Sequence, residues 1–513
     1  MRILLFEHPR KIAPDRYNDI ANTPLTSCLL TGYAAGMLVS RGHEVEIVEG
    51  YLDDLSYSEI EERISTFSPD VLGVHMVYHW KGDSELFSFL RKVKNEGMAR
   101  YVAAYGFYPT FAFREILNAC EAIDSVVVGE VEATFAELVE KVSRGESVQG
   151  MPGLATRSSD GSVSWTRREL IEDLDSIPFP VRTDAMFRLP EVNIQGSRGC
   201  YGACTFCYVN PFYSEWPRWR GRSPENIVAE IDQVIEERGL RRFYFVDPNF
   251  FGPGERGQRR ARHLAALLKE RNITFGIEGR VNDIHDETIS ALVDAGLRHI
   301  LIGLESGRDA SLKRMNKMTT VADNERALKI LRKNGIEPNI GFIMFEPDST
   351  LEDVRINYEF LQRNDLLKNL PVTANLLYHH QIILKGTPAY RMLQEQGRLK
   401  LVNESSYEGV TAYRDKSVED LAWVMRMITN FLFSRMAGLW SGRAAEPPGA
   451  SKMYSRINDY LVQRFESLLR NLESGKRLSG EERESCIKDA EIEIDNILKS
   501  LIQPPALYAG RRT

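Results

Sequence analysis

The chain has 513 residues, 43% of them hydrophobic and 27% charged, which is an ordinary balance for a globular protein and a length for two to four domains. Its formal net charge is −7 and it holds no dense block of Lys and Arg, so nothing supports a nucleic-acid partner. We find no apolar run long enough to cross a bilayer and no secretory signal pattern at the start, and six cysteines are few. We therefore expect no membrane partner and a cytoplasmic location.

Residues 1–145 alternate short apolar strands with helical patterns. Strands are expected at the segments 1–7, 43–50, 71–79, 101–106 and 124–130. A helical pattern follows each strand, and this order predicts a doubly wound parallel sheet with a ligand crevice at the carboxyl ends of its strands. A G-x-G-x-x-G fingerprint is missing after the first strand, so a dinucleotide is not the expected ligand.

The rest of the chain divides into three parts. Residues 146–190 concentrate Gly, Pro and Ser and predict a linker, with a hairpin around Asp160 and Gly161. Residues 191–400 resume the alternation and predict a partial (β/α)6 barrel, in which the active site would lie at the carboxyl ends of the strands. Its strands are expected at 191–197, 241–248, 274–279, 298–305, 337–345 and 372–379. Residues 401–513 predict a C-terminal helical domain, and part of its Met-rich and aromatic first helix is expected to roof the barrel mouth.

Three of the six cysteines lie within eight positions. Cys200, Cys204 and Cys207 form a C-x3-C-x2-C array. Thiolates are soft ligands that hold iron–sulfur clusters or zinc. A structural zinc ion needs four protein ligands, and no fourth Cys or His lies close by. Three thiolates on a cubane cluster would instead leave one iron open for a small molecule, whereas the alternative is a chance group of buried cysteines.

The array has Phe206 before its last cysteine and an expected strand before its first, and in this form it resembles the signature of radical S-adenosylmethionine enzymes. The resemblance implies that Cys200, Cys204 and Cys207 hold a 4Fe–4S cluster whose open iron binds S-adenosylmethionine. It also implies an electron donor such as flavodoxin or ferredoxin. The transferred electron would cleave the sulfonium and yield a 5′-deoxyadenosyl radical.

Polar residues stand at successive strand ends after the cysteine array, where this family places its S-adenosylmethionine contacts. They are Asp247, Asn249, Glu278, Arg280, Gly303, Glu305, Ser306 and Pro347. Arg280 matches the family arginine that pairs with the carboxylate of S-adenosylmethionine. Each charge alone would be explained as a solvated or paired strand-end residue, but together they favour the cofactor. Tyr378, His379 and His380 follow the expected sixth strand and are the catalytic candidates near the substrate.

The N-terminal sheet resembles the cobalamin-binding domain that precedes the radical domain in many of these enzymes, on the segments RGHEVEIVEG, YGFYPTF and VVVGEVEATF. The resemblance implies that two loops line the corrin crevice. Their residues are Gly106, Tyr108, Thr110, Gly129, Glu130 and Glu132. The first loop lacks the Asp-x-His-x-x-Gly motif that supplies a cobalt ligand in other cobalamin proteins, so Tyr78, His79 and Trp80 are candidates for that side of cobalt. A solvent-exposed loop histidine, or a domain that serves only as a scaffold, are the alternatives.

The resemblance implies methylation of an unactivated carbon in a small natural-product or pigment-type molecule, through a 5′-deoxyadenosyl radical and methylcobalamin. Rearrangement, cyclisation or oxidation with cobalamin is possible within the same family. A methylthiotransferase acting on tRNA would carry further cluster cysteines and a basic β-barrel, which this sequence does not offer. A cluster-bearing scaffold or cobalamin carrier without catalysis would not need Arg280 and Glu305.

Overall fold

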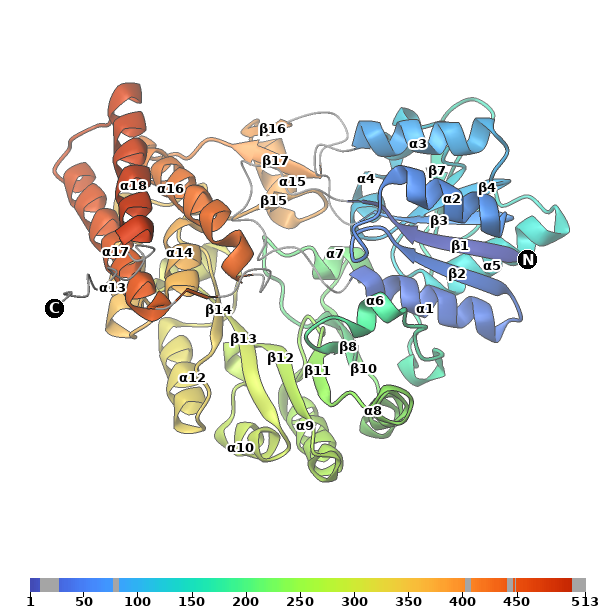
Figure 1. Ribbon diagram of the computed structural model, residues 1–513, viewed down its shortest axis with the longest axis horizontal. Coiled ribbons are helices and arrows are strands. Elements are labelled where there is room, and N and C mark those ends of the chain that lie inside the picture. The colour runs from blue at the N-terminus through green and yellow to red at the C-terminus, as the bar shows by residue number, and fades with distance from the viewer. Residues whose placement is uncertain (10–26, 77–82, 402–406, 441–445, 448, 501–513) are drawn as a thin grey trace, which may run out of the picture.

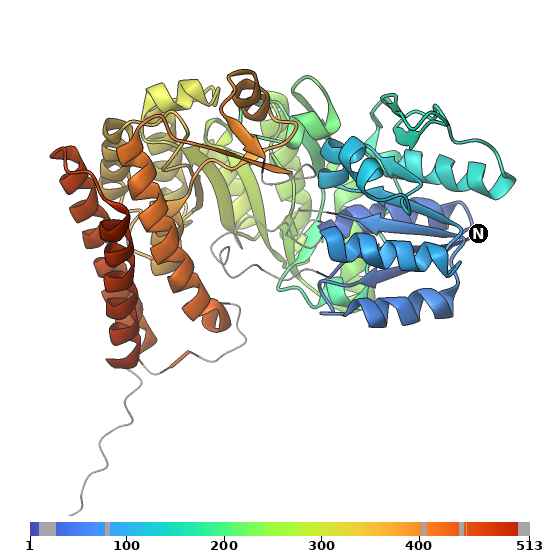
Figure 2. The same ribbon diagram turned by 90° about the horizontal axis from the view of Figure 1, so that it is seen from above.

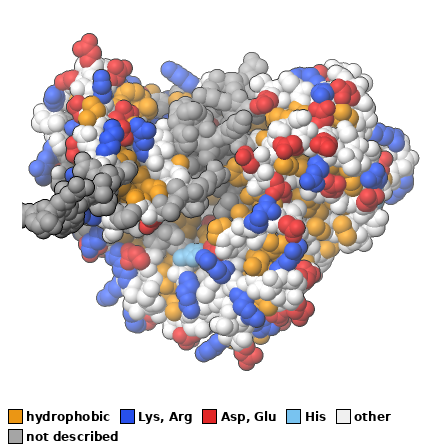
Figure 3. Space-filling model, in the orientation of Figure 1, with side chains coloured by type: hydrophobic (Ala, Val, Ile, Leu, Met, Phe, Trp, Pro, Cys, Tyr) orange, Lys and Arg blue, Asp and Glu red, His pale blue; other side chains and the backbone are white. Residues whose placement is uncertain are grey.

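The computed structural model describes residues 1–9, 27–76, 83–401, 407–440, 446–447 and 449–500. Figure 1 shows an N-terminal α/β region on one side, a central α/β region, and a group of long C-terminal helices on the other side. None of the described helices is both long and apolar enough to cross a membrane. Lys, Arg, Asp and Glu side chains are interspersed over the face shown in Figure 3.

The N-terminal region is built on a seven-stranded sheet with the order β2-β1-β3-β4-β5-β6-β7. Its first five strands in the chain pair in parallel, as the sequence predicts, and are β1 Arg2–Glu7, β2 Glu44–Glu49, β3 Val71–His75, β4 Tyr101–Tyr105 and β5 Ser125–Val127. The predicted hairpin around Gly161 forms strands β6 Leu154–Arg157 and β7 Val163–Trp165. Because β6 pairs antiparallel with β5, this part of the expected linker extends the sheet.

Helices cover both faces of this sheet. One face packs against α1 Ser27–Ser40 and α5 Glu132–Arg144. The other packs against α2 Tyr57–Phe67, α3 Asp83–Asn95 and α4 Phe107–Ala119. A sheet buried on both faces explains why its strands are nearly continuous apolar runs. After the hairpin, the chain crosses to the central region through the short helix α6 Asp184–Phe187.

The central region is a parallel sheet of five strands with the order β14-β13-β12-β11-β8. The strands are β8 Val192–Ile194, β11 Arg242–Phe245, β12 Thr274–Arg280, β13 Leu297–Glu305 and β14 Asn339–Phe342. The helices between them are α8 Pro224–Arg238, α9 Gly254–Leu268, α10 Asp286–Asp294, α11 Asp309–Arg314 and α12 Val321–Lys333, and α13 Leu351–Arg363 follows the last strand. The five strands lie where the first five barrel strands are predicted.

The sixth strand expected at 372–379 is wrong, because Leu370–Tyr378 forms helix α14. Asn369 caps this helix through its side chain, and Pro371 stands in its first turn, both of which are helix-start signals. A short apolar run does not distinguish a strand from a fully buried helix by its period. All that remains at the sixth strand position is a single parallel bridge between Phe345 and His380.

The chain then forms a small antiparallel sheet that the sequence does not predict, with the order β15-β17-β16. Its elements are β15 Ile383–Leu384, α15 Pro388–Glu395, β16 Leu399–Leu401 and β17 Glu408–Thr411. The predicted C-terminal helices follow as α16 Lys416–Trp440, α17 Ala450–Glu473 and α18 Gly480–Ser500. They share one apolar core with the central region and lie as a layer on its far side from the N-terminal sheet (Figure 2).

A buried carboxylate in α8 ties the crossing segment to the central sheet. Glu230 is fully buried and accepts hydrogen bonds from the guanidinium groups of Arg182 and Arg222. Burial acts to raise the pKa of Glu230, but these two cations together hold it below its usual value. Arg222 also donates to the hydroxyl of Tyr33 in α1, at 3.3 Å, so the same ion pair reaches the N-terminal region.

We expect Glu230→Gln to destabilise the protein by roughly 3–5 kcal/mol, because it leaves two buried guanidinium groups without their counter-charge. Urea unfolding followed by circular dichroism measures this loss. Glu236→Gln, at an exposed position of the same helix, is the matched control and should change the midpoint little. Equal midpoints for the two variants would contradict this account of the ion pair.

Candidate active site

The cysteine array lies at the end of a short hairpin next to the first strand of the central sheet. Strand β9 Ser197–Cys200 pairs antiparallel with β10 Arg218–Gly221, and Cys200 is the last residue of β9. Gly199 has a φ of +77°, and a Cβ there would collide with the carbonyl oxygen of Arg218. Only glycine therefore allows this tight approach one residue before the first cysteine. Helix α7 Val209–Tyr213 begins soon after the last cysteine.

The three thiols lie close enough to influence one another's charge. Burial is the largest cause that raises the pKa of Cys200 and of Cys207, the latter to about 12, and Cys204 adds to both shifts. No three His, Cys, Asp or Glu side chains in the described part of the chain surround a single metal position. A 4Fe–4S cluster does not require this, since each thiolate binds a different iron. The donor set therefore fits a cluster better than a single ion.

Arg280 places a cation against the cysteine loop. It ends strand β12, is buried, and its Nη1 lies 3.3 Å from Sγ of Cys204. Its Nη2 donates to the carbonyl of Lys317, and its guanidinium lies 5.5 Å from the ring centre of Tyr201. A Cβ at Gly202 would collide with this guanidinium, so a glycine is needed there too. The structure thus brings the predicted arginine and the predicted cysteines together.

Lys317 is a site residue that the sequence reasoning missed. Its ammonium is buried and lies 2.8 Å from Oε1 of Glu305, and both Lys317 and Arg280 lower the pKa of Cys200 against the effect of burial. Glu305 has a φ of +62°, at a point where the register between β13 and β14 shifts. A non-glycine residue in this conformation is strained, and such strain concentrates at functional sites. Lys317 follows α11 in the sequence and stands at no strand end, so no pattern marked it.

Three other predicted residues are fully buried and make hydrogen bonds that stabilise the backbone and side chains around the site. Asp247 is fully buried and accepts hydrogen bonds from the amide of Gly196 at 2.6 Å and the hydroxyl of Ser197 at 2.9 Å. Asn249 is equally buried, and its backbone carbonyl accepts from the same hydroxyl at 3.0 Å. These two residues therefore support the strand that carries the cysteines. Ser306 is also fully buried and donates to Asn357 at 2.7 Å.

Glu278 and Gly303 lie near the carboxyl ends of the interior strands β12 and β13. Glu278 accepts a hydrogen bond from the hydroxyl of Tyr244 at 3.0 Å, and burial raises the pKa of Glu278 to about 7. Gly303 leaves room for the Glu305 carboxylate and the Lys317 ammonium, both of which a Cβ at this position would meet. The backbone carbonyl of Pro347 accepts from the amide of Arg414 at 3.0 Å.

The catalytic candidates at the end of α14 lie in different surroundings, one in the apolar core and one beside a cavity. Tyr378 is buried, and its ring centre lies 6.5 Å from that of Phe433 in α16. The carbonyl of His379 accepts from the amide of Met344 at 2.9 Å, which fixes this turn against β14. His380 and Pro347 line a cavity of about 220 Å³ between the small antiparallel sheet and α16.

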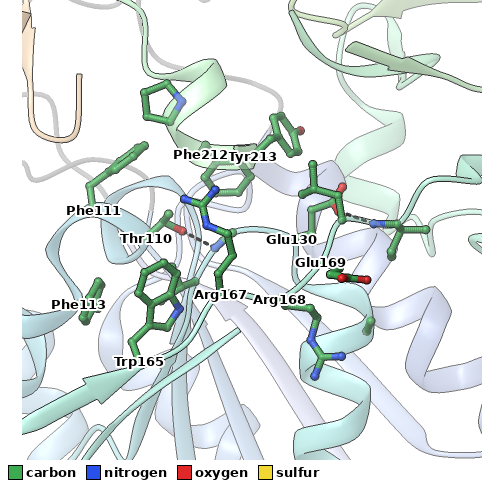
Figure 4. A pocket seen from close by; sticks show the side chains of 16 residues that line it. Thr110, Phe111, Phe113, Glu130, Trp165, Arg167, Arg168, Glu169, Phe212 and Tyr213 are labelled. Carbon is green, nitrogen blue, oxygen red and sulfur yellow. Dashed lines mark hydrogen bonds between the residues drawn. The ribbon is translucent and has the colours of Figure 1, made fainter. Parts of the chain in front are cut away.

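The N-terminal candidates surround a second cavity, of about 190 Å³ (Figure 4). Thr110, Gly129 and Glu130 line it, together with the aromatic side chains of Phe111, Phe113, Trp165, Phe212 and Tyr213. The hydroxyl of Thr110 donates to the carbonyl of Gly106 at 2.7 Å and accepts from the amide of Gly129 at 3.0 Å, so it joins the two predicted loops.

Gly106 and Gly129 have φ values of +120° and +83°, a conformation that favours glycine, where each strand ends. A Cβ at Gly106 would collide with the carbonyl oxygen of Met76, so this glycine serves internal packing. A Cβ at Gly129 would meet only the carbonyl oxygen of Phe212, at 3.4 Å, so the chain leaves room for a ligand there. Tyr108 is instead fully buried, with its ring centre 5.8 Å from that of Tyr407. Glu132 is fully buried as well. Tyr78, His79 and Trp80 lie outside the described residues.

Comparisons with known proteins agree with this geometry. Residues 194–361 match the Radical SAM superfamily. The chain is 29% identical over 377 residues to an uncharacterized methyltransferase of Pyrococcus horikoshii, covering 71% of this chain and 79% of that protein. It is 29% identical over 345 residues to the anaerobic magnesium-protoporphyrin IX monomethyl ester cyclase of Rubrivivax gelatinosus, covering 64% and 60%.

Among solved structures, the cobalamin-dependent S-adenosylmethionine radical enzyme OxsB, with aqua-cobalamin and S-adenosylmethionine bound, is similar over 98% of this chain and 84% of its own. The TM-score is 0.74 and the sequence identity 18%. Residues 194–361 are therefore similar to the Radical SAM superfamily. The chain as a whole shares the fold of OxsB, which confirms the fold class expected from its sequence.

The buried carboxyl of Asp247 should make stability depend on pH. Burial raises its pKa to about 6. The folded state then binds this proton more tightly than the unfolded state, so its contribution is complete below the unfolded pKa and is lost as pH rises through about 6. We expect Asp247→Asn to flatten the fall in stability between pH 4.5 and 7.5 by on the order of 2 kcal/mol.

Thermal unfolding of the metal-free protein across this pH range measures the effect. Asp294→Asn, at an exposed position of α10, is the control and should keep the slope of the parent chain. A slope for Asp247→Asn that equals the parent's would show that this carboxyl is already ionised at low pH in the fold.

Proposed function

We propose that the chain is a cobalamin-dependent radical S-adenosylmethionine enzyme that methylates an unactivated carbon of a small molecule. The observation that carries the proposal is the contact between Arg280 and Cys204, which places a buried cation from one strand end directly against the cysteine loop at another. In a scaffold without catalysis, this buried guanidinium would have a carbonyl oxygen and a tyrosine ring as neighbours but no carboxylate partner among the described residues. Beside a cluster that binds an anionic amino acid, it has a partner.

Each group of residues has its own task in this proposal. Cys200, Cys204 and Cys207 bind three irons of a 4Fe–4S cluster, which supplies the electron that cleaves S-adenosylmethionine. Arg280 holds the carboxylate of S-adenosylmethionine in a two-bond fork, since guanidinium and carboxylate match in shape. Asp247 keeps the cysteine strand in place through Gly196 and Ser197. An electron donor such as flavodoxin or ferredoxin reduces the cluster, and a cytoplasmic location suits such a donor.

The N-terminal sheet holds cobalamin at its carboxyl edge in this proposal. Gly129, where a Cβ would meet only the carbonyl oxygen of Phe212, lets the ligand approach the backbone, and Thr110 ties Gly129 to Gly106. The neighbouring aromatic cavity of about 190 Å³ is of the size of a bicyclic base and not of a whole corrin. We therefore assign it to the nucleotide end of cobalamin, with the base away from cobalt, which the missing Asp-x-His-x-x-Gly motif also favours.

A second outcome of the same chemistry is ring formation, because one relative is a cyclase. The two differ in whether the substrate gains a methyl group or forms a ring. Product analysis with S-adenosylmethionine carrying a deuterated methyl group separates them, since only methylation gives a product that retains the label.

The cluster assignment is tested by replacing Cys200, Cys204 and Cys207 together with Ala. The variant, purified without oxygen, should lose iron, sulfide and all 5′-deoxyadenosine formation, because no thiolate remains to hold the irons. It should keep the cobalamin content of the parent chain, since that site lies on another sheet. Formation of 5′-deoxyadenosine by the triple variant would refute the radical mechanism. A parent chain that neither retains nor takes up cobalamin would refute the N-terminal assignment.

Arg280→Ala should weaken S-adenosylmethionine binding by roughly 2–4 kcal/mol, because a buried charge pair loses one partner. Arg280→Lys should recover only part of this loss, since an ammonium does not grip both carboxylate oxygens in one plane. Equilibrium binding to the cluster-loaded protein measures both, and iron content checks that the cluster remains. Arg242→Ala, at an exposed start of strand β11, is the control. An unchanged dissociation constant in Arg280→Ala would place the carboxylate elsewhere.

A further inference from the structure

Four buried charged side chains join the two sheets that the proposed function assigns to different cofactors. Glu130 lies between β5 and α5, Glu132 is the first residue of α5, and Arg198 and Arg220 come from the β9–β10 hairpin. Nη1 of Arg198 lies 2.9 Å from Glu130 Oε1, and its Nη2 lies 2.5 Å from Glu132 Oε1. Nη2 of Arg220 lies 2.9 Å from the same oxygen of Glu130. The side chains are between 0% and 7% exposed, so water does not screen these contacts.

The hairpin requires this counter-charge. Arg198 and Arg220 face each other directly across the β9–β10 ladder. Like charges in that position destabilise a strand pair. Glu130 lies between the two guanidinium groups and bonds to both. Although burial acts to raise its pKa, Arg198 and Arg220 hold the pKa of Glu130 below its usual value, so it is charged whenever the protein is at neutral pH.

Stability alone does not explain four buried charges. Apolar residues of similar volume are often as stable as a buried ion pair, because removing charges from water is costly. Hydrogen bonds between guanidinium and carboxylate groups form only at fixed angles, so they restrict the relative orientation of the two segments that carry them. Such a network suits a junction whose function is to fix the position of the hairpin relative to the N-terminal region, and not only to hold the two together.

The network connects the two candidate cofactor sites by short steps. Arg198 stands two residues before Cys200. Glu130 stands next to Gly129, whose amide donates to the hydroxyl of Thr110 in the first turn of α4. A second oxygen of Glu130 accepts from the amide of Ile171 at 3.1 Å, which fixes the carboxylate from a third side (Figure 4). Any shift of Glu130 would therefore be felt both at the cysteine strand and at the loops around the aromatic cavity.

We propose that Glu130 and Arg198 are positioning residues that set the cysteine loop, and with it the cluster, at a fixed place relative to the cobalamin loops. The positioning of the cysteine loop is argued from contacts within the chain. That it also positions the cluster relative to cobalamin rests on the proposed function. The sequence assigns Glu130 to the corrin crevice by resemblance; here its carboxylate instead serves the junction between the two regions.

The test uses Glu130→Gln, which keeps the shape of the side chain and removes its charge, and Arg198→Lys, which keeps the charge and removes the fork. Glu137→Gln is the matched control, because Glu137 lies in α5 and makes a more exposed ion pair, with Arg168. All are made in the full chain. Hydrogen–deuterium exchange is measured on segments 196–208 and 128–134, and thermal unfolding on the same samples.

We expect both segments to exchange at least roughly tenfold faster in Glu130→Gln and in Arg198→Lys than in the parent, and to be unchanged in Glu137→Gln. A purely adhesive network would lower the unfolding midpoint without a selective change in these segments. That result, or unchanged exchange in Glu130→Gln, would overturn the proposal.

The cofactor part is read from the same variants loaded with cluster and cobalamin. The magnetic interaction between Co(II) and the reduced cluster, followed by electron paramagnetic resonance, should be well defined in the parent and broadened or weakened in Glu130→Gln. An identical interaction in both would overturn the link to the cofactors. A parent chain that binds no cobalamin would instead refute the proposed function, and the exchange data would still decide whether Glu130 positions the cysteine loop.

Discussion

The constraint on which this structure depends is the burial of charge between two separate sheets, both built mainly of parallel strands. Each sheet could fold around its own apolar core, and apolar contacts alone would hold the two together without fixing their register. Two glutamates change this. Glu130 binds two arginines of the β9–β10 hairpin, and Glu230 binds Arg222, which directly follows the hairpin, and Arg182 of the crossing segment. Glu130 joins the hairpin to the N-terminal sheet, and Glu230 joins it to the crossing segment and to α8. The hairpin that carries the cysteines is therefore held from both sides by directional contacts.

Charge also organises the cysteine loop itself. Buried thiols resist ionisation, as the raised pKa values of Cys200 and Cys207 show. Metal binding requires thiolates, so the energy of ionisation has to come from the metal and from nearby cations. Arg280 and Lys317 lie on that side and act to lower the pKa of Cys200. The same two cations would also attract an anionic ligand of the open iron. Lowering a thiol pKa and attracting an anion are compatible roles for one pair of residues.

The sequence was sufficient to predict an element of the fold wherever the local residue pattern and the tertiary structure favour the same conformation. Period and end signals predicted the N-terminal sheet, five central strands and the long C-terminal helices, and the spacing of Cys200 to Cys207 located the loop. Prediction failed where tertiary context decides. The segment 372–379 has the composition of a strand, yet its burial between α16 and α17 makes it a helix. Lys317 comes to the site through the fold alone, and the roles of Glu130 and Glu132 follow from arginines that lie far away in the sequence.

The loss of the sixth strand has a geometric consequence for the whole molecule. A closed barrel would surround its carboxyl edge with loops of its own strands and keep other domains at a distance. Here the central sheet stops after β14, and α14 and the C-terminal helices cover its far side (Figure 2). The near side keeps its first strand, β8, and the cysteine hairpin next to the N-terminal sheet (Figure 1). This side leaves the hairpin in contact with Glu130 and Glu132 of the N-terminal region. The helix at the sixth position and the charged junction at the first are thus two parts of the same arrangement.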